Sequence, residues 1–444
     1  MTFDDSCIKC KIGAKINDSQ MVELEKHVII IGGGAFGLST ALHLTEPSQN
    51  KYKVTILDRL PIPATDASST DLNKIIRCEY GSQLEYRDLA LEAIERWKAW
   101  NVDYQAGNSS DGGLFHQTGV LFACADANPD SIQKQSFDSL NHLVPNLVPN
   151  EAIDASKWPV LQSMRAQFGS GYFNPICGWA NSTDTVKFMA VMLERRGVSL
   201  VTGIDGFVTS IKHVRLDSQW KHVITVKSGK HYECDICVLA TGAWSSSLVP
   251  ELSDVLVATA QPVAHYRIPP DMQPLFEQSN VVWTADLPRT GFYGFPMRRV
   301  STSGETEFIV KVAWHSSGCL TAPSVPENIV VPKDTFKVYD AFTKQVFPDT
   351  LGKLAIHSTR ICWYTDTFDG NFIIGPVTST SMNDERPDSF VVATGGSGHG
   401  FKFAPVIGKI VVDAIEKRET RFTRFFAWRE NKNNTNASDA LRMS

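Results

Sequence analysis

The sequence predicts an α/β fold in which a Rossmann-like nucleotide-binding domain carries a second, mainly antiparallel domain inserted into it. Three observations support this prediction. The segment HVIIIGGGAFGLSTALHL has the pattern of an apolar strand, a glycine turn and a helix. The segment VTILDR predicts a second strand, which ends in an acid. Two later segments, DICVLATGAW and FVVATGGSGHG, repeat the strand and glycine-turn design, so all these strands are expected to share one sheet.

The first glycine turn predicts a dinucleotide site. Gly32, Gly34 and Gly37 form a G-x-G-x-x-G pattern between the strand and the helix. The first glycine allows the tight turn, the second lets the backbone approach a pyrophosphate, and the third lets the helix pack on the strand. The unpaired N–H groups at the helix N-terminus favour an anion there. Asp58 ends the next strand, where a ribose-binding acid belongs. The acid favours an unphosphorylated ribose, and therefore FAD or NAD rather than NADP.

The remaining segments predict the domain organisation. Residues 27–80, 181–260 and 358–418 are assigned to the nucleotide-binding domain. Residues 81–180 and 261–357 are richer in aromatic residues and in alternating strands such as TEFIVKVAWHS, and they are assigned to the second domain. Residues 1–26 are polar and are expected to be a disordered leader, and 419–444 are expected to be a C-terminal tail.

Composition excludes several classes of partner. A length of 444 residues suits two domains. A net charge of −5 gives no reason to expect nucleic acid or an anionic membrane surface, and no apolar run approaches the roughly 20 residues needed to span a bilayer. The chain has neither the apolar core of a signal peptide nor a terminal Ser-Lys-Leu address, so we expect a cytoplasmic protein, with the peroxisome as the alternative. No coiled coil is evident, and a monomer is expected.

The nine cysteines are expected to be mostly reduced thiols. Cys7 and Cys10 have C-x-x-C spacing, but no second pair follows them at the spacing of a zinc site. Cys234 and Cys237 have the same spacing inside a predicted strand, which points the two side chains to opposite faces. No metal site is predicted.

Five segments, in order along the chain, resemble the monomeric sarcosine oxidase family, which includes pipecolate, saccharopine and fructosyl-amino-acid oxidases. They are DLNKIIRCEYG, ATGAW, GFYGFP followed by KVAWH, CWYTDTFDGNFIIG, and GGSGHGFKFAPVIG. The resemblance runs from about residue 27 to 418. It implies that the nucleotide-binding domain is of the glutathione-reductase type, that it holds FAD, and that the inserted domain binds the substrate.

The resemblance also implies a set of cofactor-binding residues. Cys362 is similar to the cysteine that forms a thioether to the flavin, a reaction in which a thiolate meets an electron-poor ring. Lys74 occupies a position that is arginine in sarcosine oxidases and lysine in fructosyl-amino-acid oxidases, near the flavin ring. The further residues assigned to the cofactor are Ala35, Phe36, Arg59, Ser69, Trp244, Gly398, Gly400, Phe401 and Lys402.

For the substrate, the resemblance implies two cations and three catalytic residues. Arg77 and Lys402 match the pair that holds the substrate carboxylate, since charge-assisted hydrogen bonds suit that task. Lys311 matches the lysine that promotes the reaction of the reduced flavin with oxygen by placing a positive charge nearby. His315 and Tyr364 resemble pocket residues that position the amine, although a lone histidine is more often structural.

The implied activity is oxidation of the C–N bond of a secondary amino acid, giving an imine and then a carbonyl compound and an amine, while O₂ becomes H₂O₂. Arg77, His399 and Tyr364 resemble the sarcosine and pipecolate side rather than the fructosyl side, so saccharopine, pipecolate or sarcosine is the expected substrate. A fructosyl amino acid and a natural-product amine stay open as alternatives. So do a flavin dehydrogenase that uses an electron carrier, a flavin-binding protein without turnover and, most distantly, an NAD-dependent dehydrogenase.

Overall fold

The structure is a computed structural model of the chain. It describes residues 25–431, except for 50, 108–111, 126–130, 217–218, 303–304, 316–318, 321–322, 324–332 and 379–386. The expected leader falls outside the described residues up to residue 24, as do Cys7 and Cys10.

A parallel sheet forms the centre of the nucleotide-binding domain. Its strands lie in the order β21 (Ile373–Pro376), β22 (Phe390–Thr394), β13 (Ile236–Leu239), β1 (Lys26–Ile31), β2 (Tyr52–Asp58) and β9 (Ser199–Thr202). All neighbours are parallel except β21, which runs antiparallel to β22. Both faces of β1 are buried, and its continuous run of β-branched residues suits a strand that is covered on both sides. The sheet therefore joins the strands that the sequence predicted.

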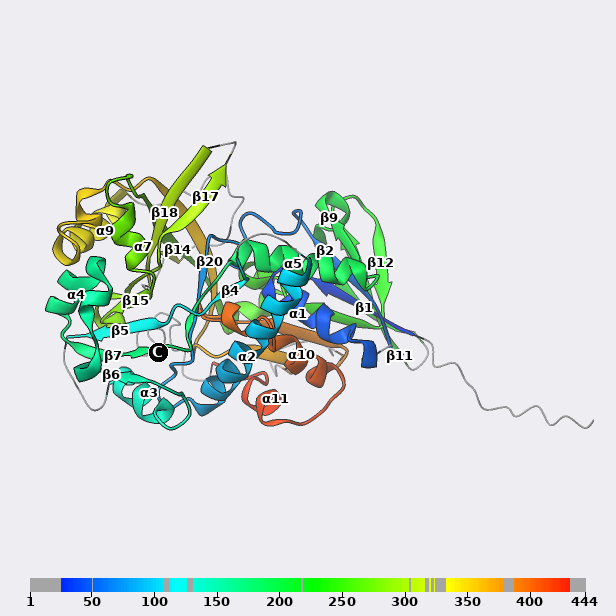
Figure 1. The fold of residues 1–444 in the computed structure, drawn as a ribbon. Helices are drawn as coiled ribbons and strands as arrows, with labels where there is room; N and C mark the ends of the chain where they lie inside the picture. The colour runs from blue at the N-terminus through cyan, green and yellow to red at the C-terminus, as the bar shows by residue number, and fades with distance from the viewer. Residues whose placement is uncertain are drawn as a thin grey trace, which may run out of the picture.

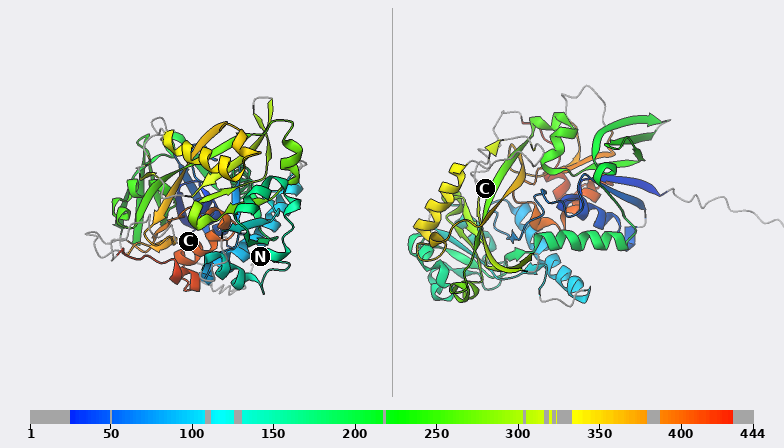
Figure 2. Two further views of the ribbon diagram at one scale, coloured as in Figure 1. Left: turned by 90° about the vertical axis from the view of Figure 1, so that its left-hand side faces the viewer. Right: turned by 90° about the horizontal axis from the view of Figure 1, so that it is seen from above.

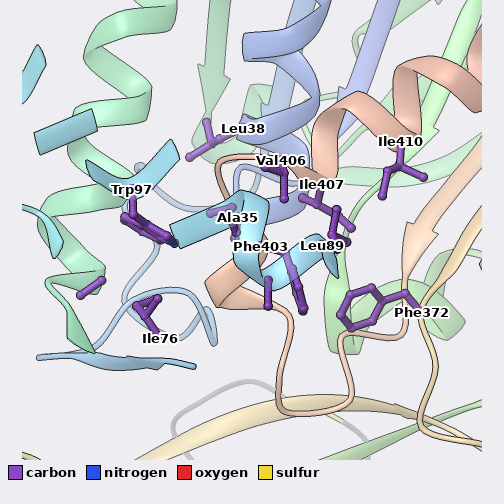
Figure 3. Close-up of a cluster of buried hydrophobic side chains, with 14 of the residues drawn as sticks. Ala35, Leu38, Ile76, Leu89, Trp97, Phe372, Phe403, Val406, Ile407 and Ile410 are labelled. Carbon is purple, nitrogen blue, oxygen red and sulfur yellow. The ribbon is translucent and has the colours of Figure 1, made fainter. Parts of the chain in front are cut away.

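Helices cover this sheet and bury a large hydrophobic core. Helix α1 (Ala35–Leu44) packs against α5 (Ser182–Arg195) and α10 (Ile407–Ile415), and the long helix α2 (Leu84–Gly107) lies beside them (Figure 1). Trp97 of α2 and Phe403 point into the same cluster as Leu38 of α1 and Ile407 of α10 (Figure 3). Apolar residues at Ile407, Ile410 and Val411 give α10 the helical spacing that one buried face requires.

A second sheet, of ten strands, forms the inserted domain. The main path is β19 (Cys319–Leu320), β14 (Leu256–Arg267), β18 (Glu305–Trp314), β16 (Phe292–Gly294), β15 (Val282–Ala285), β5 (Val120–Cys124), β7 (Ser170–Asn174) and β6 (Val148–Pro149). In addition, β17 (Arg298–Thr302) pairs with β18, and β20 (Ser358–Thr367) pairs with β14. Neighbouring strands are antiparallel except for β15 and β5.

Shorter helices cover the outer side of this sheet. Helices α4 (Gln162–Gln167), α7 (Gln273–Gln278) and α9 (Lys333–Val346) lie over it, away from the parallel sheet (Figures 1 and 2). Met164, Phe276 and Tyr339 from these helices share a buried cluster with Val310 and Val312 of β18. The domain also holds α3 (Ile132–Leu140) and α8 (Leu287–Thr290).

Two small sheets complete the fold. One has the order β3 (Lys74–Ile76), β8 (Gly178–Ala180) and β4 (Phe115–His116). The other is the antiparallel sheet β10 (Val208–Leu216), β11 (Gln219–Val226) and β12 (His231–Cys234). After β12 the chain continues into β13 and then into the short helix α6 (Ser245–Leu248). Within the described residues, no helix combines the length and the apolar character that crossing a bilayer requires.

Strand pairing differs from the expected domain boundaries at residues 260 and 358. Strand β14 runs across residue 260, and β20, which we assigned to the nucleotide-binding domain, pairs along its length with β14. We therefore propose boundaries nearer residues 256 and 367. The expected C-terminal tail is also ordered in its first part, because α11 (Arg421–Phe425) packs on α2 and α10 and Phe426 is fully buried. Sequence composition alone did not reveal this packing.

Candidate active site

A cavity of about 400 Å³ lies at the carboxyl ends of the parallel strands β1, β2, β13 and β22. Ligands of open α/β sheets bind at this position, and the volume lies in the range of small-molecule sites. Most of the predicted site residues line the cavity: Gly32, Gly34, Ala35, Phe36, Asp58, Arg59, Ser69, Lys74, Trp244, Cys362, Tyr364, Gly398, Gly400, Phe401 and Lys402. Gly37, Arg77, Lys311 and His315 do not line it.

The glycine turn has the shape that a bound pyrophosphate needs. Gly32 has φ +108°, and a Cβ there would lie 2.4 Å from the carbonyl oxygen of Ala240. A Cβ on Gly37 would lie 1.9 Å from the carbonyl oxygen of Gly32, so this glycine allows close packing between helix and strand. The space beside Gly34 is open, with the hydroxyl of Ser69 as its nearest neighbour at 3.5 Å. Gly34 is also the N-cap of α1 and has no side chain that could accept from the first N–H groups of the helix, which leaves this end of the helix suited to an anion.

Asp58 lines the cavity beside the glycine turn. Its carboxylate accepts hydrogen bonds from the backbone N–H of Gly33 at 2.7 Å and of Leu60 at 2.9 Å. Burial raises the pKa of this carboxyl above its ordinary value. Arg59 follows it, forms an ion pair with Asp66 and lies over the ring of Trp244 at 4.4 Å. A carboxylate held in this position can accept a hydrogen bond from a ribose hydroxyl, so the residues around Asp58 fit a dinucleotide.

Cys362 lies at the opposite end of the cavity, on β20. Its side chain is almost fully buried, and the ammonium of Lys74 donates to its sulfur at 3.3 Å. Although burial opposes a charge, the neighbouring Cys362 and Asp71 raise the pKa of Lys74 above its ordinary value. Tyr364, two residues further along the strand, packs against Gly398, where a Cβ would lie 2.4 Å from the ring. The thiol of Cys362, the ammonium of Lys74 and the phenol of Tyr364 therefore line the same part of the cavity.

Lys311 lies behind the cavity wall. Its ammonium lies 2.8 Å from a carboxylate oxygen of Asp71 and also donates to the carbonyl of Asn73. It lies 4.4 Å from the ring centre of Phe295, which lines the cavity. Burial lowers the pKa of Lys311 to about 8. A lysine with such a pKa can both carry and release a proton near neutral pH.

Lys311 should make the stability of the fold depend on pH. An unfolded lysine has a pKa of about 10.4, whereas the folded value is about 8. Between these values the unfolded chain binds a proton that the folded chain does not, so this lysine makes the free energy of unfolding rise with pH, by roughly 3 kcal/mol in all. Chemical denaturation of the wild type and of Lys311→Met across this range should show a difference in unfolding free energy between the two proteins that changes with pH in favour of the wild type. A difference between the two proteins that does not change with pH would contradict the prediction.

Arg77 and Lys402 meet at Tyr80. The ring centre of Tyr80 lies 5.0 Å from the guanidinium of Arg77 and 5.3 Å from the ammonium of Lys402. Lys402 donates to the hydroxyl of Tyr80 at 2.9 Å and to the carbonyl of His399 at 2.7 Å. Burial, and then the charge of Arg77, lower the pKa of Lys402 well below its ordinary value. Among the described residues neither cation has a carboxylate within salt-bridge distance, so both would gain from a negatively charged ligand.

His399 continues this network. Its Nε2 lies 3.0 Å from the carbonyl oxygen of Gly370, a neighbour that can only accept, so Nε2 carries the proton. Its Nδ1 then accepts from the hydroxyl of Tyr80 at 3.0 Å. Burial, and then the charge of Lys402, lower the pKa of this histidine well below its ordinary value. His399 is therefore neutral, and its Nδ1 orients the hydroxyl of Tyr80.

The two remaining catalytic predictions differ in their surroundings. Tyr364 lines the cavity, and burial raises its pKa well above the ordinary value. His315 does not line the cavity, and its ring centre lies 6.1 Å from the ring centre of Tyr364. The structure therefore brings His315 close to the site without placing it in the wall.

Beside the two cations lies a buried cluster of three groups that metals can use. The ligand atoms of Cys78, Glu79 and Cys177 lie within 4.8 Å of one another. The carboxylate of Glu79 already accepts hydrogen bonds from the Asn174 amide at 2.6 Å and from the Cys78 backbone at 3.0 Å. These bonds explain the cluster as satisfied packing, and the absence of a metal site stays a prediction.

Sequence reasoning missed several members of the site. Tyr293 of β16 and Phe295, which directly follows that strand, line the cavity, although both lie in the GFYGFP segment that was recognised only as a motif. Asp71 and Tyr80 lie in the DLNKIIRCEYG segment, and their contacts are with partners far away in the chain. Their polar or aromatic character inside a recognised motif was the available signal.

The fold and the cavity define an α/β oxidoreductase that binds a dinucleotide at the ends of its parallel strands. The chain matches the family model described as FAD dependent oxidoreductase over residues 27–414, and it belongs to that family. FAD is therefore its cofactor, in agreement with the fit of the glycine turn and Asp58.

Individual relatives cover nearly the whole chain. L-saccharopine oxidase of Schizosaccharomyces pombe is 27% identical over an alignment of 412 residues that covers 88% of this chain and 90% of that protein. A monomeric sarcosine oxidase from Bacillus sp. is 26% identical and covers 86% of this chain and 90% of its own. The crystal structure of fructosamine oxidase from Aspergillus fumigatus (Amadoriase II) is similar with a TM-score of 0.73 and 25% identity, over 94% of this chain and 93% of that chain.

Proposed function

We propose that the protein is an oxidase that uses FAD to oxidise the C–N bond of a small secondary amino acid, with O₂ as the electron acceptor. The observation that supports this proposal is the pair of cations that meet at Tyr80: Lys402, which is buried and lines the cavity, and Arg77. Two cations on one tyrosine, with no carboxylate of the described residues within salt-bridge distance, suit a substrate that brings its own carboxylate. The relatives named for saccharopine and sarcosine support the same substrate class.

The residues divide the work as follows. Lys402 and Arg77 hold the carboxylate, which fixes the position of the neighbouring C–N bond. Tyr364 and His315 orient the amine. Bound FAD would accept the two electrons of the C–H bond beside the nitrogen, and the nitrogen would lose a proton, which gives an imine that water hydrolyses to a carbonyl compound and an amine. Lys311 supplies positive charge behind the cavity wall for the reaction with oxygen.

The substrate panel that tests this proposal contains saccharopine, pipecolate, sarcosine, proline, fructosyl-valine and fructosyl-lysine. Release of H₂O₂ from the purified protein with one of the first three would support the proposal and name the substrate. The strongest release with a fructosyl amino acid would instead support the alternative that the Amadoriase II structure suggests. If the protein contains flavin but releases no H₂O₂ with any compound of the panel, both substrate classes would be contradicted, and larger natural-product amines would be tested next.

The acceptor requires a separate measurement. A carrier-linked dehydrogenase would be reduced by the same amino acid but would pass its electrons to an artificial acceptor and not to oxygen. Comparing the rates of substrate oxidation with O₂ and with a quinone or dye distinguishes the two enzymes. We propose O₂, because Lys311 lies only one side chain from the cavity.

We also propose that Cys362 holds the flavin through a thioether. The sulfur lines the cavity, is buried, and accepts a hydrogen bond from the ammonium of Lys74 at 3.3 Å. Acid denaturation of the wild type should therefore leave the yellow colour on the polypeptide, whereas Cys362→Ser should release all of it. Cys234→Ser, at a buried cysteine in the neighbouring sheet, is the matched control and should keep the colour bound. Release from the wild type would contradict the proposal.

For assembly and location we propose a monomer in the cytoplasm, with the peroxisome as the alternative. Light scattering of the purified protein measures its mass directly, and cell fractionation with an antibody separates the two compartments. A mass of twice the chain in dilute solution would contradict the monomer.

A further inference from the structure

A row of polar side chains crosses the antiparallel sheet from its surface to Lys311. In the strand register, His265 of β14 faces Lys311 of β18 on one side and Ser358 of β20 on the other. Directly opposed residues place their side chains on the same face of a sheet. Ser358 is exposed, His265 is 9% exposed and Lys311 is 2% exposed. The row therefore leads from solvent into the interior.

Asp71 closes the gap between the histidine and the lysine. The hydroxyl of Ser358 lies 3.2 Å from Nδ1 of His265. Nε2 of the same histidine is buried, has no hydrogen-bond partner among the described residues, and lies 4.0 Å from one oxygen of Asp71. The other carboxylate oxygen lies 2.8 Å from the Lys311 ammonium. An unpaired ring nitrogen aimed at a buried carboxylate is uncommon, because burying an unpaired polar atom costs free energy.

We propose that Ser358, His265 and Asp71 form a path that carries protons from solvent to Lys311. Asp71 is the group that exchanges protons with the lysine, and His265 is the group that exchanges them with the surface. Lys311 thereby recovers the proton that it gives up in each turnover. Of this path, the sequence analysis assigned a role only to Lys311, although Asp71 lies in the DLNKIIRCEYG segment.

The chemistry of the proposed function requires such a supply. This step rests on O₂ being the acceptor: each O₂ takes up two electrons and two protons and leaves as H₂O₂. Oxidation of the substrate releases the two electrons, together with one proton from carbon and one from nitrogen. If the Lys311 ammonium donates one proton to the reduced oxygen, a proton from solvent must restore the ammonium, and the proton lost by the substrate amine returns to solvent. Atoms and charges then balance over one cycle.

The electrostatics of Asp71 permit this exchange. Burial would raise its pKa, but the charges of Lys311, Lys74 and Arg360 hold it well below the ordinary value. Once Lys311 has given up its proton, the strongest of these charges is absent, and the carboxylate becomes a better proton acceptor. Lys74, 3.3 Å away, then keeps the carboxylate in place.

The groups around His265 make it a neutral carrier at rest. Burial lowers its pKa to about 4, the carboxylate of Asp71 opposes that shift, and Lys311, Arg360 and His357 add to it. A neutral imidazole with one free nitrogen can take up a proton on one side and release one on the other. His357, its neighbour in space, instead pairs with Glu307 at 3.4 Å and lies outside the row.

The test measures the exchange of the Lys311 Nζ protons with solvent by NMR in holoenzyme labelled with ¹⁵N-lysine. The signal is identified by its loss in Lys311→Met. We expect His265→Gln to slow this exchange about tenfold or more, consistent with the usual contribution of a positioned proton-transfer group. His357→Gln is the matched control and should exchange as the wild type does. Ser358→Ala, at an exposed position, should slow the exchange less, and it provides a second variant if His265→Gln does not fold.

A rapid-reaction measurement then tests the role in catalysis. In His265→Gln, reduction of the flavin by the substrate should keep its wild-type rate, whereas reoxidation by O₂ should slow about tenfold and show a larger solvent isotope effect. Wild-type proton exchange in both His265→Gln and Ser358→Ala would overturn the path. A wild-type enzyme that does not react with O₂ would overturn the proposed acceptor instead, and the exchange measurement would still decide the path.

Discussion

Replacing Lys311 with methionine is expected to slow the reaction of the reduced enzyme with oxygen about 100- to 1,000-fold. The ammonium is buried, held by Asp71 at 2.8 Å and 4.4 Å from the ring centre of Phe295, which lines the cavity. A charge in such a site is preorganised and weakly screened, so its removal costs far more than removal of a surface charge. Methionine keeps the volume and flexibility of the side chain. Stopped-flow reoxidation of the substrate-reduced enzyme measures the effect.

The comparison needs two controls. Lys337→Met removes an exposed lysine of α9, whose side chain is 79% exposed, and should leave both half-reactions unchanged. In Lys311→Met, reduction by the substrate should change much less than reoxidation, because the carboxylate is held elsewhere. Equal losses in both half-reactions would indicate a distorted cavity, and an unchanged reoxidation rate would contradict a role in oxygen chemistry.

The sequence predicted the fold because its signals are local. The apolar strand, the three glycines and the acid of Asp58 lie within one β-α-β unit, where each residue has a physical task that the chain neighbours reveal. The position of the cavity could be predicted from the same β-α-β unit, because parallel strands place their carboxyl ends at one edge of the sheet. The glycine turn and Asp58 have the geometry that this reading requires, down to the close approach of Gly32 and Ala240.

The interior of the site could not be predicted in this way. Asp71 binds a lysine 240 positions further along the chain, and His265 reaches its partners only through the pairing of β14 with β18 and β20. Periodicity shows which face of a strand is buried but not which strand lies beside it. The same reason explains the boundary at residue 358: β20 contains a cofactor motif, yet its hydrogen bonds belong to the antiparallel sheet.

Replacing Lys402 with methionine is expected to lower kcat/KM for the amino acid roughly 10- to 150-fold while FAD stays bound. One charge-assisted hydrogen bond contributes about 1.5–3 kcal/mol, and a factor of ten corresponds to about 1.4 kcal/mol. Lys402 is 3% exposed, and its bonds to Tyr80 and His399 fix the ammonium where a carboxylate would dock. Steady-state kinetics on the substrate and on its amide, which has no carboxylate, measure the effect.

The amide is the decisive comparison. If Lys402 binds the carboxylate, the wild type should prefer the acid over the amide and the variant should lose that preference, with Arg77→Met behaving in the same way. Lys409→Met, at an exposed position on the following helix, should keep the wild-type ratio. A variant that loses activity on the acid and the amide alike would show that Lys402 supports the packing of Tyr80 and His399 rather than the substrate. Because the two cations share Tyr80, the double variant should lose less than the product of the single effects.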